Sequence, residues 1–159
     1  GSGVLNNPST SARIEAVNAY VNARVSFVDD SRQFGRADLW SAASDTLRRG
    51  RGDCEDYALA KMAMLRAAGI PSKDLYFVLV RDLVRMADHA VLVVRADGRN
   101  LLLDNSTDTV LDADMVRDYR PVFTFASTGT WTHGYRRERM PSVEWASATG
   151  IAAAKPLKL

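Results

Sequence analysis

An apolar stretch in the middle of the chain limits most strongly how the chain can fold. The interior of residues 54–68 is rich in Ala, Leu and Met, and only Lys61 and Arg66 interrupt its apolar character. A helix that is apolar on all sides is buried by other elements. Gly69 suits the position after a helix C-terminus, and Pro71 follows it by two residues. We therefore expect a central helix that the rest of the chain covers.

The sequence pattern changes from helical to β-type after this stretch. Two further helices are predicted before it, at residues 11–26 and 42–48, and one after it, at residues 112–119. Short β-type runs follow at residues 75–80, 90–96, 101–103, 122–125 and 131–135. Helices followed by antiparallel strands are typical of the α+β class. We predict that the central helix packs on one face of an antiparallel sheet.

The length and charge of the chain bound its organisation and its partners. A chain of 159 residues has the length of one domain. A net charge of +2 gives no reason to expect a nucleic-acid partner, and no apolar run approaches the roughly 20 residues of a membrane span. We expect a lead-in at residues 1–8 that starts with a Gly-Ser-Gly tag remnant, one domain at residues 9–146, and a flexible tail at residues 147–159. No signal peptide is present, and a tag remnant at the start is compatible with its removal.

The single cysteine stands at the start of the predicted central helix. Cys54 follows a glycine-rich turn, so its thiol lies at the positive end of the helix dipole, where the thiolate is favoured. Its own backbone N–H is a candidate oxyanion donor. His89 and Asp104 come later, each at the edge of a β-type run. This order supplies a candidate nucleophile, general base and orienting carboxylate.

A predicted hairpin indicates whether the histidine and the aspartate can meet. If Asp97 and Gly98 form a two-residue loop, the numbers of paired positions sum to 195. His89 then faces position 106, two residues beyond Asp104. Diagonal neighbours on one face of a sheet lie about 5–8 Å apart, within reach of an imidazole–carboxylate hydrogen bond. We therefore expect both side chains on the same face.

Alternatives to this triad stay open from the residues alone. His133 is the rival base, because the chain has two histidines. A lone buried cysteine is commonly a small core residue, and a histidine at a strand start is commonly structural. Asp104 begins an Asp-Asn-Ser sequence that is also typical of an ordinary turn.

Three carboxylates surround the cysteine, and they admit two interpretations. Asp53, Glu55 and Asp56 complement the dipole of the predicted helix, but their negative charge opposes formation of a thiolate. A cation would resolve this conflict, and oxygen ligands favour a hard ion such as calcium. Backbone carbonyls or water would have to complete the roughly six to eight oxygens that calcium takes. Capping and calcium binding are equally supported by these residues.

Several stretches together resemble one bacterial family. Trp40, Gly-Arg-Gly-Asp-Cys-Glu-Asp-Tyr-Ala at 50–58, Asp-His-Ala-Val-Leu at 88–92 and Leu-Asp-Asn at 103–105 resemble the bacterial transglutaminase-like cysteine proteinases. The best-known members are the LapG-type periplasmic proteases. The resemblance covers residues 8–140, and the stretch around the cysteine is its specific part. In papain relatives the histidine lies more than about a hundred residues after the cysteine, whereas here the gap is 35 residues (89 − 54).

The resemblance implies a fold and a set of site residues. The fold would be a papain-like, transglutaminase-type α+β core. The implied catalytic triad is Cys54, His89 and Asp104. The implied ligands of a calcium ion are the acids that flank the cysteine: Asp53, Glu55 and, more weakly, Asp56.

The resemblance also implies a function, beside which two alternatives stand. LapG-type proteases release large adhesins by cutting near their N-termini, in a linker with paired alanines. An inner-membrane receptor that senses cyclic di-GMP holds them in check. The implied protein is thus a calcium-dependent periplasmic cysteine endopeptidase that disperses biofilm. The alternatives are another acyl-transfer enzyme, such as a transglutaminase or amidase, and a non-catalytic calcium-responsive binding domain. Trp40, Trp131 and Trp145 would form part of the core or a partner surface.

Overall fold

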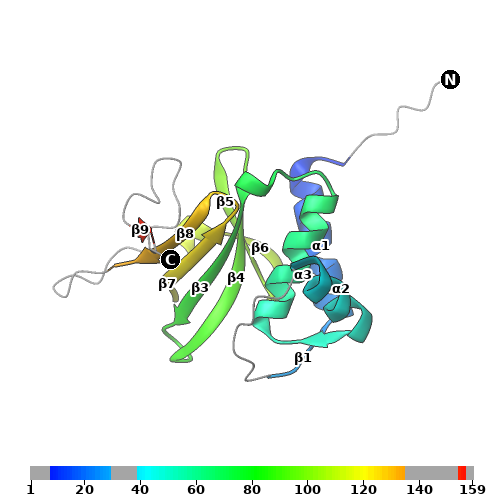
Figure 1. Ribbon diagram of the computed structural model, residues 1–159, viewed down its shortest axis with the longest axis horizontal. Coiled ribbons are helices and arrows are strands. Elements are labelled where there is room, and N and C mark those ends of the chain that lie inside the picture. Colours follow the sequence, from blue (N-terminus) through cyan, green and yellow to red (C-terminus); the bar gives the residue numbers. More distant parts are fainter. Residues whose placement is uncertain (1–7, 30–38, 135–153, 157–159) are drawn as a thin grey trace.

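The computed structural model describes residues 8–29, 39–134 and 154–156, and it combines a layer of helices with one antiparallel sheet (Figure 1). The helices are α1 (Thr10–Arg24), α2 (Leu39–Arg49) and α3 (Cys54–Ala67), with single 3₁₀ turns η1 (Ser72–Asp74) and η2 (Ala113–Met115). The strands are β1 (Ser26–Phe27), β2 (Arg51–Gly52), β3 (Leu75–Asp82), β4 (Ala87–Ala96), β5 (Arg99–Asp104), β6 (Thr107–Asp112), β7 (Tyr119–Ala126), β8 (Gly129–His133) and β9 (Ala154–Pro156).

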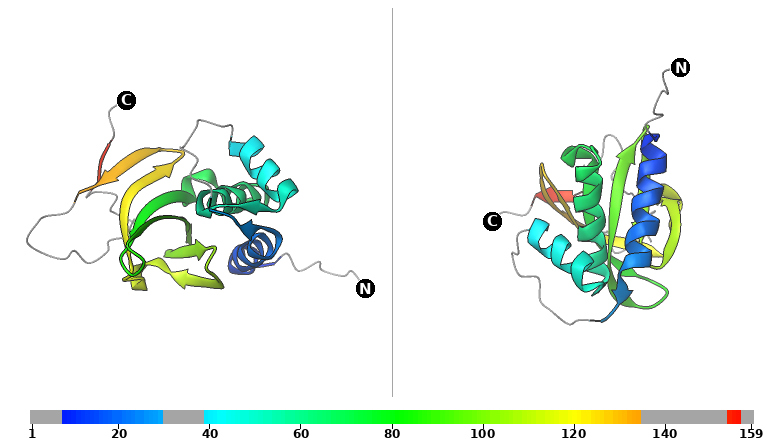
Figure 2. Two further views of the ribbon diagram at one scale, coloured as in Figure 1. Left: turned by 90° about the horizontal axis from the view of Figure 1, so that it is seen from below. Right: turned by 90° about the vertical axis from the view of Figure 1, so that its right-hand side faces the viewer.

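The large sheet has the order β6-β5-β4-β3-β7-β8-β9, and its neighbouring strands are antiparallel. All three helices lie on the same face of this sheet (Figure 2). The predicted α+β class, with a helix packed on an antiparallel sheet, is therefore confirmed. Among the described residues, no helix is both long and apolar enough to cross a membrane.

The central helix is α3, as its apolar sequence predicts. Ala60 and Leu65 are completely buried, and α3 packs against β4, α1 and α2. Burial of each Leu-sized side chain contributes roughly 1.5–3 kcal/mol, so this interface is a main source of stability. Gly69 follows the helix with a φ of 92°, which a residue with a side chain rarely adopts. The predicted C-terminal glycine signal is thus confirmed.

The hairpin between β4 and β5 has the predicted register. Asp97 and Gly98 form its loop with φ values of 52° and 72°, as a type I′ turn requires. Ala96 pairs with Arg99, and the ladder continues with the same sum of 195. This register fixes which side chains of the two strands share a face.

Two elements after the hairpin differ from the sequence-based expectation. The helix predicted at residues 112–119 is wrong: only the 3₁₀ turn η2 forms there, and Tyr119 begins β7. Strand β6 was not predicted. It lies at the edge of the sheet with two exposed residues in its first half, so it lacks the clear apolar alternation of a buried strand. Pairing with β5 and β3 overrides the weak local preference of both segments.

A short segment of the predicted tail is described. Ala154–Pro156 form β9 beside β8. The edge of β8 offers unpaired backbone groups, to which even a short segment can add hydrogen bonds. Trp145 lies outside the described residues.

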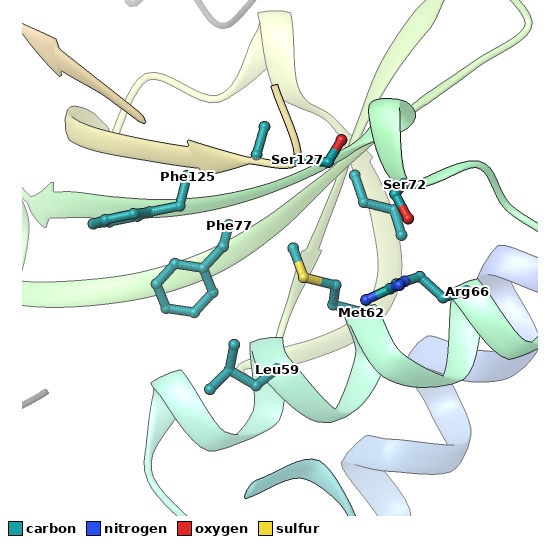
Figure 3. A pocket seen from close by; sticks show the side chains of 9 residues that line it. Leu59, Met62, Arg66, Ser72, Phe77, Phe125 and Ser127 are labelled. Atoms are coloured by element: carbon teal, nitrogen blue, oxygen red, sulfur yellow. The ribbon is translucent and has the colours of Figure 1, made fainter. Parts of the chain in front are cut away.

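One apolar pocket of about 280 Å³ lies between α3 and the sheet. Leu59 and Met62 of α3 face Phe77 of β3 and Phe125 of β7 across it (Figure 3). The two phenylalanine rings meet edge to face, with their centroids 5.9 Å apart. None of the predicted site residues lines this pocket, so it is a feature of the packing between helix and sheet.

Candidate active site

Cys54 is the first residue of α3, and a complete capping box holds it there. Asp53 Oδ1 accepts hydrogen bonds of 3.1 Å from the backbone N–H groups of Glu55 and Asp56. In return, Asp56 Oδ2 accepts one of 3.1 Å from the Asp53 N–H. These reciprocal bonds satisfy helix N–H groups that have no intrahelical acceptor. The predicted helix start is confirmed, and so is the capping interpretation for Asp53 and Asp56.

The turn before the cysteine is fixed by a short parallel pairing. Strand β1, just after α1, pairs with β2, and Val28 N–H donates to Gly52 O at 2.9 Å. A Cβ atom on Gly52 would lie 2.5 Å from the Cβ of Asp56, so only glycine fits there. Glycine at position 52 therefore allows the backbone to pass close to the capping box.

His89 of β4 and Asp104, the last residue of β5, meet as the register predicts. His89 Nε2 and Asp104 Oδ1 are 2.9 Å apart, and the side chains are only 10% and 1% exposed. His89 and Cys54 line the same two pockets. The predicted contact between histidine and aspartate is thus confirmed, while the catalytic roles of the three residues stay a prediction.

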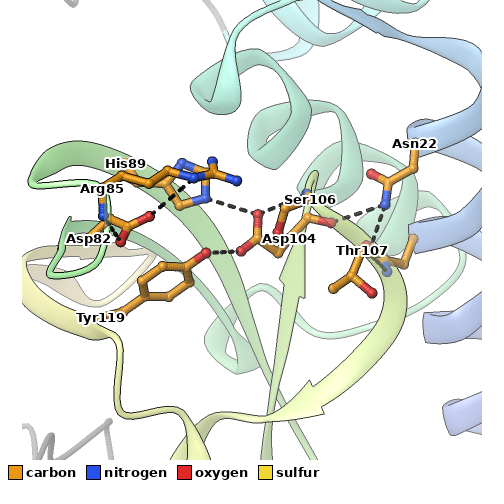
Figure 4. Close-up of polar contacts among 9 residues, drawn as sticks. Asn22, Asp82, Arg85, His89, Asp104, Ser106, Thr107 and Tyr119 are labelled. Carbon is orange, nitrogen blue, oxygen red and sulfur yellow. Dashed lines mark hydrogen bonds and ion pairs between the residues drawn. The ribbon is translucent and has the colours of Figure 1, made fainter.

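Asp104 is held from several directions (Figure 4). Tyr119 donates its hydroxyl proton to Asp104 Oδ2, and the Ser106 N–H donates to Oδ1 at 3.1 Å. Asn22 of α1 donates to the backbone carbonyl of Asp104 at 3.0 Å. The Tyr119 ring also lies 5.4 Å from the His89 ring, centroid to centroid. Sequence reasoning missed Tyr119 because its segment was predicted to be a helix, and nothing in the sequence of α1 indicates Asn22.

The charges of this pair support each other. Burial lowers the pKa of His89, but its hydrogen bonds with Asp104 and Cys54 outweigh this and raise it from 6.5 to about 9. Burial raises the pKa of Asp104, but the hydrogen bond with His89 and the one from Tyr119 lower it from 3.8 to about 2. Near pH 7 the two side chains are therefore an imidazolium and a carboxylate.

Two pockets meet at Cys54 and His89. The first has a volume of about 520 Å³ and is strongly acidic, with a single arginine among the residues that line it: Phe27, Asp29, Asp53, Glu55, Asp82, Arg85, Ala87, Asp88, Asn105 and Ser106. The second has a volume of about 250 Å³ and mainly apolar walls from β3 and β7: Leu79, Val80, Val122 and Phe123. A substrate peptide that crosses Cys54 would therefore place side chains in both pockets.

The carboxylates around Cys54 are the kind of ligand that calcium binds, but they do not converge on one point. Burial and the negative charges of Asp53 and Asp56 raise the pKa of Glu55 from 4.5 to about 7. Such crowding of carboxylates is what a bound cation relieves. However, within residues 8–29, 39–134 and 154–156, no three His, Cys, Asp or Glu side chains converge on a point that could hold a metal ion. Carboxylate oxygens are the ligands that calcium prefers, so the donor chemistry fits.

The rival base and Trp131 lie elsewhere. His133 is in β8, where its Nε2 is 2.7 Å from Thr124 Oγ1 and burial lowers its pKa. Neither pocket that contains Cys54 includes His133. Trp131 is a partly buried residue of β8, which favours packing over a partner surface for this side chain.

A cysteine at a helix start, facing a histidine–aspartate pair on an antiparallel sheet, defines the class of papain-like thiol enzymes. Residues 3–132 match the family model of the bacterial transglutaminase-like cysteine proteinases, and the chain belongs to this family. It is similar to calcium-bound LapG from Legionella pneumophila, with a TM-score of 0.69 and 29% identity over 86% of this chain and 76% of LapG. An EGTA-treated LapG structure gives 0.67 and 29% over 80% and 68% of the two chains. The search of curated proteins found no match.

Proposed function

We propose that the chain is a calcium-dependent cysteine endopeptidase with Cys54 as its nucleophile. One observation carries this proposal: His89 binds Asp104 and lines, together with Cys54, the two pockets that meet at the cysteine. Membership of a cysteine proteinase family supports the same chemistry. Because the three side chains lie at one site, a separate structural role for each of them is a weaker explanation than a shared catalytic role.

In the proposed reaction, the thiol proton already resides on His89, which is an imidazolium near pH 7, and the Cys54 sulfur attacks the peptide carbonyl. The Nε2 atom of His89 contacts Asp104, which leaves Nδ1 for the sulfur. The backbone N–H of Cys54, at the first helical position, stabilises the oxyanion. His89 then gives its proton to the leaving amine, and a thioester remains on Cys54. Water, activated by His89, hydrolyses this thioester and restores the thiol.

Asp53 and Glu55, with Asp56 as a third candidate, would hold the calcium ion. When bound, calcium supplies positive charge beside Cys54 and so offsets carboxylates that otherwise oppose a thiolate. The raised pKa of Glu55 supports this assignment, since it marks uncompensated negative charge. Support also comes from the similar LapG of Legionella pneumophila, which has calcium-bound and EGTA-treated structures.

The proposed substrate is a large cell-surface adhesin, cut near its N-terminus in a linker with paired alanines. The mainly apolar pocket beside Cys54 suits an uncharged, apolar side chain, which is consistent with alanine at the cleavage site. The resemblance to LapG-type proteases further suggests action in the periplasm and inhibition by an inner-membrane receptor of cyclic di-GMP. Adhesin release would then disperse biofilm.

The test is cleavage of a purified adhesin N-terminal fragment that contains such a linker. We expect wild-type protein to cut it, and Cys54→Ala or excess EGTA to abolish cutting. His89→Gln should lower the rate at least about 100-fold, whereas His133→Gln, its matched control, should leave the rate unchanged. An intact fragment together with an alkylation-resistant Cys54 would contradict the proposal and favour a binding domain. Rapid alkylation with no cutting would favour another acyl-transfer reaction, which amine incorporation would reveal.

A further inference from the structure

An exposed aromatic ring lies in the wall of the proposed active site. Phe27, the last residue of β1, is 57% exposed, and it lines the acidic pocket of about 520 Å³ together with Cys54 and His89. A single apolar residue on an open surface is common and needs no explanation. Phe27 differs from that case, because its ring borders a cavity that also contains the proposed nucleophile.

The backbone that carries Phe27 is fixed relative to Cys54. Phe27 pairs with Gly52 in the parallel ladder of β1 and β2, two residues before the cysteine. The N–H groups of Ser26 and Val28 both donate to backbone carbonyls of the turn before the cysteine, at 2.8 and 2.9 Å. A substrate that contacts the ring therefore meets a surface whose position is set before binding, which lowers the entropy lost on binding.

A second link joins β1 to the helix that carries the thiol. Tyr57 is buried in α3, three residues after Cys54. Its hydroxyl donates to the backbone carbonyl of Val25, two residues before Phe27. The backbone of this segment is thus held on both sides of the ring, while the ring itself faces solvent.

The chemistry of the acidic pocket gives the ring a distinct role. Beside the cysteine, Phe27 and Ala87 are the apolar side chains among the described residues that line it, and the others are mostly carboxylates. Charged groups give no favourable contact to an aliphatic side chain, whereas an aromatic ring does. An apolar substrate side chain that enters this pocket therefore binds at Phe27.

We propose that Phe27 is a specificity-determining residue of the peptidase, whose ring binds one apolar substrate side chain close to the scissile bond. Successive side chains of an extended peptide point to opposite sides. An alanine in the apolar pocket beside Cys54 thus has a neighbour that points towards the acidic pocket and its ring. This inference rests on the proposed function and adds to its substrate a second, longer apolar residue beside the alanine pair.

Peptide binding tests the contact without turnover. Fluorescent peptides with an alanine pair are titrated onto Cys54→Ala protein in calcium, and fluorescence anisotropy gives the Kd. Each position that flanks the pair is changed in turn from alanine to norleucine, which has an unbranched aliphatic side chain. We expect norleucine at one of these positions to lower the Kd about tenfold, because several methylene groups leave water against the ring.

Variants of the ring show whether this gain comes from Phe27. Phe27→Ala should remove the preference for norleucine, whereas Phe27→Tyr keeps a ring and should retain it. Met115→Ala is the matched control, since Met115 is 71% exposed and lines neither pocket at the cysteine. In cleavage assays, Phe27→Ala should raise KM for the norleucine peptide about tenfold with kcat unchanged, as expected when ground-state and transition-state binding are lost equally.

Two results would overturn the inference: no gain from norleucine at any position, or a gain that persists in Phe27→Ala. A melting temperature that falls in Phe27→Ala while the preference stays intact would assign the ring to packing instead. If the protein shows the ring-dependent preference but cuts none of the peptides, the proposed function fails and the contact stands. If it cuts them without any dependence on Phe27, the proposed function stands and this inference fails.

Discussion

Among single residues, Asp104 is fixed by neighbours on several sides. His89, Tyr119 and the Ser106 N–H bind its two oxygens. Such a carboxylate has little freedom to turn, so the imidazole it holds has one orientation. A fixed imidazole lowers the entropy that a reaction must otherwise lose on reaching its transition state.

Tyr119→Phe tests this restraint at the residue scale. The substitution removes the hydroxyl that donates to Asp104 Oδ2 and keeps the ring beside His89. We expect kcat to fall about fivefold and the free energy of unfolding to fall by about 1–2 kcal/mol, because a hydrogen bond to a charged group is lost. Peptide cleavage and urea unfolding measure the two effects. Tyr20→Phe, at a residue that is 52% exposed, is the control, and an equal loss in both variants would contradict the assignment.

Among the elements, the start of α3 and the hairpin of β4 and β5 were the most predictable from sequence. Glycine and capping residues around Cys54, and the Asp97-Gly98 loop, act through local geometry that the chain itself encodes. Tyr119 could not be found in this way, because its position depends on β7 pairing with β3, where Tyr119 meets Asp82 from 37 residues away (119 − 82). The part played by Asn22 likewise depends on a packing contact between α1 and a distant turn.

Gly52→Ala tests the element scale, at the junction of β2 and α3. The added Cβ would lie 2.5 Å from Asp56 Cβ, so the capping box must shift. We expect a loss of about 1–3 kcal/mol in the free energy of unfolding and slower alkylation of Cys54, whose helix start is displaced. Gly134→Ala is the matched control, since nothing lies within 4 Å of its added Cβ. Similar alkylation rates in both variants would show that the box does not position the thiol.

Across the whole molecule, four buried or partly buried groups make stability depend on pH. Without calcium, the raised pKa of Glu55 lowers stability as pH rises from 4.5 to 7. His89 stabilises the fold fully below pH 6.5, and its contribution is lost as pH rises through about 9. Lys61 acts in the opposite direction between pH 8 and 10.5. The lowered pKa of Asp104 adds stability that is lost as pH falls from 3.8 to about 2.

These signs predict the shape of the stability curve in EGTA. The free energy of unfolding should fall from about pH 5 to 8, with about 2 kcal/mol of the loss between pH 6.5 and 8 due to His89. The free energy of unfolding should level off near pH 8–9 and rise again towards pH 10.5. It rises because the free-energy cost of deprotonating Lys61 on folding becomes smaller as the pH approaches 10.5. Urea unfolding at each pH measures the curve. His89→Gln should flatten it between pH 7 and 8, and an unchanged slope there would count against the ion pair.

The hydrogen bonds from Asn22 to the turn after β5 join parts of the chain that are 82 and 85 residues apart. Contacts between such distant residues form slowly, because a long loop must close first. The first helix supplies none of the proposed catalytic side chains, yet it holds the backbone of one of them. During synthesis, the histidine–aspartate pair therefore gains its full support only after the chain up to Thr107 has left the ribosome. The Cys54 thiol therefore lacks its oriented base while the chain is still being synthesised.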